Sequence, residues 1–155
     1  MKTVLFVCTA NICRSPMAGV IFNALAEDGA LPFRAQSAGT AALEGRAMDP
    51  NAVAALEEAG IYPGPHAARQ VVEAMLEGSE LVLAMTPKHA ATVRRLGKDP
   101  PGGVYTLTGY ASGVVAGGPR LLRAHHGRLP EHLAPALRAR RAHSRAPRGV
   151  GLGRA

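Results

Sequence analysis

The chain of 155 residues has only two cysteines, Cys8 and Cys13, and no tryptophan. Two cysteines are too few for a disulfide framework, and a chain of this length can bury a core without one. No apolar run is long enough to span a membrane, and the first residues already belong to an apolar strand, so we expect neither a transmembrane helix nor a signal peptide. These absences predict a reduced, cytoplasmic protein.

Acidic residues are almost missing from the C-terminal part of the chain. Residues 114–155 contain nine Arg, no Lys and one acid, Glu131, whereas residues 1–113 contain nine Lys plus Arg against ten Asp plus Glu. The net formal charge of +7 therefore divides into −1 and +8. Because no aromatic residue interleaves the arginines of the tail, we expect no nucleic acid and no membrane as partner. The change in composition predicts a domain over 1–113 and an atypical Arg/Pro-rich segment over 114–155.

Short apolar runs alternate with amphipathic segments throughout residues 1–113. The runs predict strands over 4–7, 33–37, 81–85 and 104–107. The amphipathic segments predict helices from Ser15 to Ala26, from Pro50 to Ala59, after His66 to Leu76, and from Thr86 to Leu96, with Ser15, Asp49 and Thr86 as N-caps. This alternation predicts an α/β fold in three layers, a four-stranded parallel sheet flanked by helices on both sides.

The loop after the first strand carries the strongest functional signal, in the stretch VLFVCTANICRSPMA over 4–18. A loop between the end of a strand and the start of a helix points several backbone N–H groups at one place, which favours an anion there. Arg14 adds a planar fork that can hold two phosphate oxygens. Cys8 lies in the same positive field, which favours its thiolate, and a thiolate facing a bound tetrahedral oxyanion can attack phosphorus.

With these residues, the chain resembles the low-molecular-weight protein tyrosine phosphatases, whose signature loop is written V-C-x-G-N-x-C-R-S-P. Further similar stretches are SAGT at 37–40, HAAR at 66–69, LVLAMTPKH at 81–89 and VYTLTGYASG at 104–113. The resemblance covers residues 1–113 and implies the phosphotyrosine protein phosphatase I-like fold, closed by a C-terminal helix. One departure is Ala10, where the family has Gly. Ala would strain the loop by about 1 kcal/mol if that position required a positive φ.

The resemblance also implies a role for each loop residue. Cys8 is the expected nucleophile and Arg14 its catalytic partner, while Ser15 assists the thiolate. His66 is expected to support the loop by hydrogen bonds to Ser15 and Asn11. Asn11 and Ser37 are expected to brace it, so the loop-supporting residues are Asn11, Ser15, Ser37 and His66. The expected phosphate-binding residues are Thr9, Ala10, Asn11, Ile12, Cys13, Arg14 and Ser15. Neither a metal nor another cofactor is expected.

The general acid of the family is missing from this sequence. The family has an Asp-Pro loop, commonly followed by Phe-Gly, before its terminal helix, but no aspartate follows Asp99 here. The general acid is therefore unknown, and turnover is expected to be impaired. One explanation is a frame-shifted reading of a GC-rich gene, because dropping one base from the codons of 118–130 allows DPDSFGRTTAAYR with freely chosen third bases. The other is a genuine Arg-rich extension.

Several activities remain open at this point. A protein tyrosine phosphatase would take phosphotyrosine proteins and release inorganic phosphate. A protein arginine phosphatase would take phosphoarginine, but there the residue before the second loop Cys is Thr, where this chain has Ile12. An arsenate reductase needs further cysteines, and a non-catalytic phospho-ligand binder would need no acid. Cys13 is expected either to form a reversible disulfide with Cys8 or to pack in the core.

Overall fold

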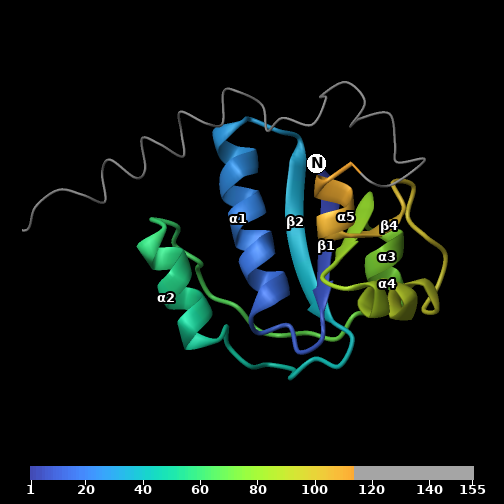
Figure 1. Ribbon diagram of the computed structural model, residues 1–155, viewed down its shortest axis with the longest axis horizontal. Coiled ribbons are helices and arrows are strands. Elements are labelled where there is room, and N and C mark those ends of the chain that lie inside the picture. The colour runs from blue at the N-terminus through green and yellow to red at the C-terminus, as the bar shows by residue number, and fades with distance from the viewer. Residues whose placement is uncertain (114–155) are drawn as a thin grey trace, which may run out of the picture.

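Four parallel strands form one sheet within residues 1–113, the part of the chain that the computed structural model describes (Figure 1). They are β1 (Lys2–Cys8), β2 (Phe33–Gly39), β3 (Leu81–Ala84) and β4 (Val104–Thr106). The strand order is β2-β1-β3-β4, and each neighbouring pair is parallel. The expected α/β fold with a four-stranded parallel sheet is confirmed. The expectations for 114–155, including the closing helix and the frame shift, lie outside the described residues and stay predictions.

Helices cover both faces of this sheet, which gives the predicted three layers (Figure 1). They are α1 (Arg14–Asp28), α2 (Pro50–Glu58), α3 (Glu73–Glu77), α4 (Pro87–Arg94) and α5 (Leu107–Ala111). On one face, Val4 and Phe6 of β1 pack with Phe22 of α1 and Tyr110 of α5. On the other face, Leu5 of β1 belongs to the core that α3 and α4 cover. None of the helices in this described part has the length and apolar character that crossing a bilayer requires.

Two of the three predicted N-caps are found, and one prediction is wrong. Asp49 accepts hydrogen bonds from the N–H groups of Asn51 and Ala52, and Thr86 accepts one from the N–H of His89. Ser15, however, is not a cap, because α1 already begins at Arg14 and its N-cap residue, Cys13, makes no side-chain capping bond. The hydroxyl of Ser15 is instead drawn into the interior by the partners described below.

The helix predicted after His66 is much shorter than expected. Only Glu73–Glu77 is helical, because the preceding backbone is hydrogen-bonded to other segments. The carbonyl of Arg69 accepts from Gly39 N at 2.9 Å, and Val71 N donates to the carbonyl of Gly39 at 2.8 Å. These bonds hold residues 66–71 as an extended segment that crosses the carboxyl end of β2, next to the loop after β1.

The side chain of Asn23 covers part of the outer edge of the sheet. It lies on α1 and donates from Nδ2 to the carbonyl of Ala35 at 3.4 Å, while its Oδ1 accepts from Ala35 N at 2.7 Å. Ala35 is in β2, which has a neighbour on one side only among the strands of residues 1–113. The two bonds therefore satisfy backbone groups that no strand pairs.

Candidate functional site

The loop between β1 and α1 turns its carbonyl groups outward to the surrounding segments. The carbonyls of Cys8, Thr9 and Ala10 accept from the N–H groups of residues 40, 41 and 43 at 2.8, 3.0 and 3.1 Å, and that of Ile12 accepts from Asp49 N at 2.7 Å. In contrast, no backbone N–H from Thr9 to Ser15 donates a hydrogen bond to any group in residues 1–113. Seven consecutive N–H groups at the start of a helix are thus available to an anion.

Cys8 lies beneath this loop, at the last position of β1. It is 3 % exposed, and its Sγ is 2.9 Å from the hydroxyl oxygen of Ser15. The Ser15 oxygen also accepts a hydrogen bond from Nδ2 of Asn11 at 2.9 Å, and its other neighbour is the carbonyl of Ala38 at 3.3 Å. Since the longer contact is the weaker one, the Ser15 proton is available to a thiolate on Cys8.

Asn11 connects the loop to two other segments, β2 and residues 66–71. Its side chain donates to Ser37 Oγ at 3.0 Å and accepts from the N–H of Arg69 at 2.9 Å, and its backbone carbonyl is 2.7 Å from Nε2 of His66. Asn11 is fully buried, with a φ of 58°. Asn tolerates this left-handed conformation better than other non-glycine residues do. Ala10 is not among the residues with positive φ, so its substitution for Gly introduces no such strain.

The structure changes the role expected for His66. Its ring bonds the Asn11 carbonyl but makes no hydrogen bond to Ser15 in the described part of the chain. The Ser15 hydroxyl lies deeper, where Cys8, Asn11 and the Ala38 carbonyl surround it. Among the described residues, hydrogen bonds therefore link His66 to Ser15 only through Asn11.

Arg14 and Cys13 both lie on the surface of the loop. Arg14 is exposed, and its guanidinium has no hydrogen bond or ion pair within 1–113, so it is available to a ligand. Cys13 is exposed as well, which contradicts the expectation that it packs in the core. Both cysteines are free thiols. The disulfide between them stays a prediction.

Gly39, in the SAGT stretch, allows the loop to approach the end of β2. A Cβ at this position would collide with the carbonyl oxygen of Thr9 and would lie 3.1 Å from Asn11 N and 3.2 Å from Ala10 C. Since all three atoms belong to backbone, they cannot move aside as a flexible side chain would. A glycine is therefore required here for the loop to keep its shape.

His89 is a loop contact that the sequence pattern does not identify, since the pattern places this residue only within the helix expected from Thr86 to Leu96. It is 7 % exposed, and its Nε2 lies 2.7 Å from the hydroxyl of Thr9, the residue after Cys8. Its Nδ1 lies 2.9 Å from the hydroxyl of Thr86, the N-cap of α4. Burial lowers the pKa of His89, and the positive charges of Arg14 and Lys88 lower it further. The signal that the sequence offered is the spacing of three positions between Thr86 and His89 in LVLAMTPKH, which brings the side chain of the N-cap next to the histidine.

Replacing His89 by glutamine is expected to make the free energy of unfolding fall less steeply as the pH is lowered. The folded pKa of His89 lies below its ordinary value of 6.5, so the unfolded chain binds the proton more readily. The stability contributed by the neutral ring is therefore complete above pH 6.5 and is lost as the pH falls toward the folded pKa. Urea unfolding of wild type and His89→Gln between neutral and mildly acidic pH measures this difference. Parallel profiles would show that protonation of His89 does not oppose folding.

The residues of this loop together define a class of site. A buried cysteine under a ring of unbonded N–H groups, with an arginine at the helix start, is the arrangement of a cysteine-dependent phosphatase loop. Residues 3–117 match the family model described as low molecular weight phosphotyrosine protein phosphatase, and the chain belongs to this family.

Named relatives fall into two groups of phosphatases. A low molecular weight protein-tyrosine-phosphatase of Streptomyces coelicolor is 45 % identical over 96 residues, which are 60 % of this chain and 58 % of that protein. A protein-arginine-phosphatase of Bacillus subtilis is 37 % identical over 110 residues, covering 71 % of this chain and 73 % of the relative. The chain thus spans less than two thirds of the Streptomyces protein.

Solved structures agree with this assignment. The crystal structure of a YwlE mutant from Bacillus subtilis has a TM-score of 0.66 and 32 % identity, covering 89 % of this chain and 99 % of that one. The low molecular weight protein tyrosine phosphatase from T. tengcongensis also has a TM-score of 0.66 and 32 % identity, with 93 % and 95 % covered. The expected family and fold are confirmed.

Proposed function

We propose that this chain is a cytoplasmic protein tyrosine phosphatase that works through a cysteinyl-phosphate intermediate and turns over slowly. The observation that carries the proposal is the run of N–H groups from Thr9 to Ser15, none of which bonds another group within residues 1–113, directly after the buried Cys8. These groups and the fork of Arg14 would bind the three equatorial oxygens of a phosphoryl group and stabilise the charge that develops on them. Neither nucleic acid nor membrane is a partner in this proposal.

In the first step, the Cys8 thiolate forms a bond to phosphorus while the bond from phosphorus to the leaving oxygen breaks. The Ser15 hydroxyl, 2.9 Å from the sulfur, stabilises the thiolate before attack and again when it leaves. In the second step, water attacks phosphorus, the S–P bond breaks, and inorganic phosphate departs. Asn11, Ser37 and His66 hold the loop in position for both steps.

A general acid is the missing part of this mechanism. The chain has three aspartates, Asp28, Asp49 and Asp99. Asp49 lies next to the loop, but its Oδ1 accepts the bonds that cap α2. Asp28 is the last residue of α1 and Asp99 precedes β4, so both lie toward the amino ends of the strands, at the opposite end of the sheet from Cys8. Loss of general acid catalysis costs about 10²- to 10⁴-fold in rate.

Phosphoarginine proteins are the second candidate substrate, because one relative is named a protein-arginine-phosphatase. Ile12 favours phosphotyrosine, since the arginine phosphatases have Thr before the second loop cysteine. Ile12 lies within the loop whose N–H groups would bind the phosphoryl group in this proposal. A branched apolar side chain there fits an aromatic leaving group better than a charged guanidinium.

Single-turnover and steady-state hydrolysis of p-nitrophenyl phosphate, phosphotyrosine and phosphoarginine test the proposal. We expect measurable turnover of p-nitrophenyl phosphate, whose leaving group needs no proton, and turnover of phosphotyrosine about 10²- to 10⁴-fold slower. Equal turnover of the first two would mean that another residue replaces the acid. A preference for phosphoarginine would favour the second candidate, and no reaction with any of the three would leave a phospho-ligand binder.

A further inference from the structure

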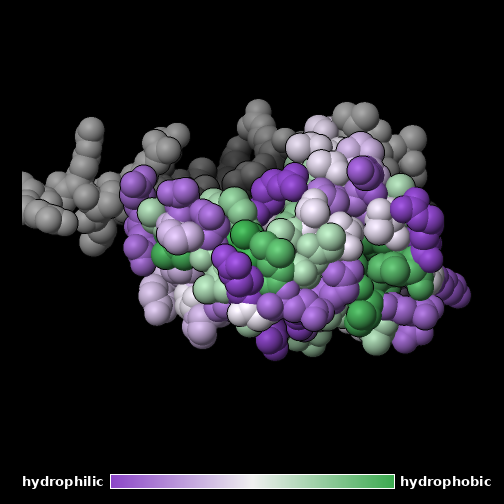
Figure 2. Space-filling model, turned by 90° about the horizontal axis from the view of Figure 1, so that it is seen from below, coloured by the Kyte–Doolittle hydropathy of each residue, from purple (hydrophilic) through white to green (hydrophobic). Residues whose placement is uncertain are grey.

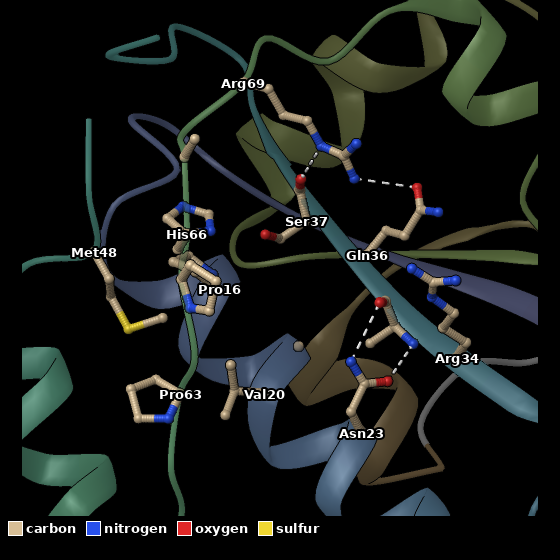
Figure 3. A pocket seen from close by; sticks show the side chains of 14 residues that line it. Pro16, Val20, Asn23, Arg34, Gln36, Ser37, Met48, Pro63, His66 and Arg69 are labelled. Carbon is tan, nitrogen blue, oxygen red and sulfur yellow. Dashed lines mark hydrogen bonds between the residues drawn. The ribbon is translucent and has the colours of Figure 1, made fainter. Parts of the chain in front are cut away.

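A second cavity lies behind the phosphate-binding loop, at the edge of the sheet (Figure 3). Its volume is about 350 Å³, and side chains of α1, β2 and the segment 63–69 line it. Neither Cys8 nor Arg14 is among its lining residues, so it is distinct from the site proposed for catalysis. Its volume lies at the lower end of the range typical of small-molecule sites.

Two arginines give this cavity a positive charge. Arg34 has neither a side-chain hydrogen bond nor an ion pair within residues 1–113. Arg69 is held in place, donating from Nε to the Ser37 carbonyl at 3.0 Å and from Nη2 to Gln36 Oε1 at 3.1 Å, as Figure 3 shows. Its remaining N–H groups are available to a ligand. None of the described residues lining the cavity is Asp or Glu.

The opposite wall of the cavity is apolar. It is formed by Pro16 and Val20 of α1, by Met48 and by Pro63, which lie on the side away from Arg34 and Arg69 in Figure 3. Pro16 and Met48 are buried, so this wall is packed rather than loose. An occupant would therefore have an apolar body against this wall and an anionic group toward the arginines.

We propose that this cavity binds a small organic anion, with a flat apolar body and carboxylate or phosphate groups held by Arg34 and Arg69. Charge-assisted bonds to arginine are stronger than neutral ones, and a side chain already held in position loses less entropy on binding. The lower face of the molecule, shown in Figure 2, mixes hydrophilic and hydrophobic residues rather than presenting one continuous apolar surface. This favours a small ligand over a protein partner.

The cavity shares residues with the support of the phosphate-binding loop. Asn11 hydrogen-bonds three of the lining residues. Its side-chain amide bonds Ser37 and Arg69, and its backbone carbonyl bonds His66. A ligand that shifts any of them changes the geometry of Asn11, and phosphate in the loop acts on the same residue from the other side. Binding at the two sites is therefore coupled, and the coupling is reciprocal.

The test is an NMR titration of the full ¹⁵N-labelled chain with isophthalate, a flat dianion that the enzyme cannot hydrolyse. Inorganic phosphate first saturates the loop, and ionic strength is held constant. We expect saturable shifts of the amides of residues 34–37 and 66–69, with a dissociation constant on the order of 1 mM for a ligand of this size. Arg34→Gln is expected to weaken binding about tenfold.

Arg95→Gln is the matched control, because it removes the same charge from an exposed residue outside the cavity. It is expected to leave the isophthalate affinity unchanged, and Arg34→Gln to leave turnover of p-nitrophenyl phosphate unchanged. Shifts confined to residues 9–15, no saturation, or equal weakening by both variants would overturn the proposed site. Equal isophthalate affinities with and without phosphate would overturn the coupling. The binding readout does not depend on catalysis, so it stands apart from the proposed activity.

Discussion

The Cys8→Ser variant is expected to lose phosphate release by at least about 10⁴-fold with p-nitrophenyl phosphate. The serine hydroxyl is a far weaker nucleophile than a thiolate, and no described group lies beside it as a base: its neighbour is another hydroxyl, that of Ser15, at 2.9 Å from the present sulfur. The measurement is release of inorganic phosphate under steady-state and single-turnover conditions.

Binding of phosphate should survive this substitution, because the ring of N–H groups belongs to the backbone from Thr9 to Ser15. Titration of the variant with inorganic phosphate serves as the test of an intact loop. Cys13→Ser is the matched control for loss of a thiol, because Cys13 is exposed and its expected contribution to phosphate binding comes from its backbone N–H. This variant should keep most of the turnover. Undiminished phosphate release by Cys8→Ser would rule out Cys8 as the nucleophile.

Asn11→Ala is expected to lower the free energy of unfolding by about 3–5 kcal/mol. The substitution removes three side-chain hydrogen bonds and leaves Ser15, Ser37 and the N–H of Arg69 without that partner. It also places alanine at a φ of 58°, which costs a further 1–2 kcal/mol or so. Equilibrium unfolding in urea measures the loss.

Asn11→Gly separates the two contributions. It removes the same bonds but accepts the left-handed backbone, so it should be about 1 kcal/mol less destabilising than Asn11→Ala. Both variants should also lose activity, because the Asn11 side chain positions Ser15 and the Asn11 backbone carbonyl is the group that His66 bonds. A cost below about 1 kcal/mol for Asn11→Ala would show that these bonds do not hold the loop.

Local signals in the sequence predicted local structure well. The apolar runs marked all four strands, and Asp49 and Thr86 were correctly predicted as N-caps, since a cap depends only on its own side chain and the next turn. Ser15 has the same local signature, but a tertiary site competes for its hydroxyl. Local preference could not show that Cys8 and Asn11 would take it.

Long-range pairing explains the remaining differences. Residues 66–71 have helical spacing, but Gly39 donates one backbone hydrogen bond to this segment and accepts another from it. These two bonds keep the segment extended. The contact between His89 and Thr9 joins residues 80 positions apart, so no window of sequence contains both. His66 was expected to reach Ser15 because the resemblance places it near the loop. The resemblance does not give the depth at which each partner lies.

The bonds between Asn23 and Ala35 also bear on the behaviour of the protein at high concentration. An edge strand with free N–H and C=O groups is a template on which a second molecule can add a strand. The carboxamide of Asn23 presents one acceptor and one donor to Ala35, much as a neighbouring strand would, and so occupies that position. The side chain of Asn23 thereby blocks the pairing of a strand from a second molecule at Ala35 in the folded protein.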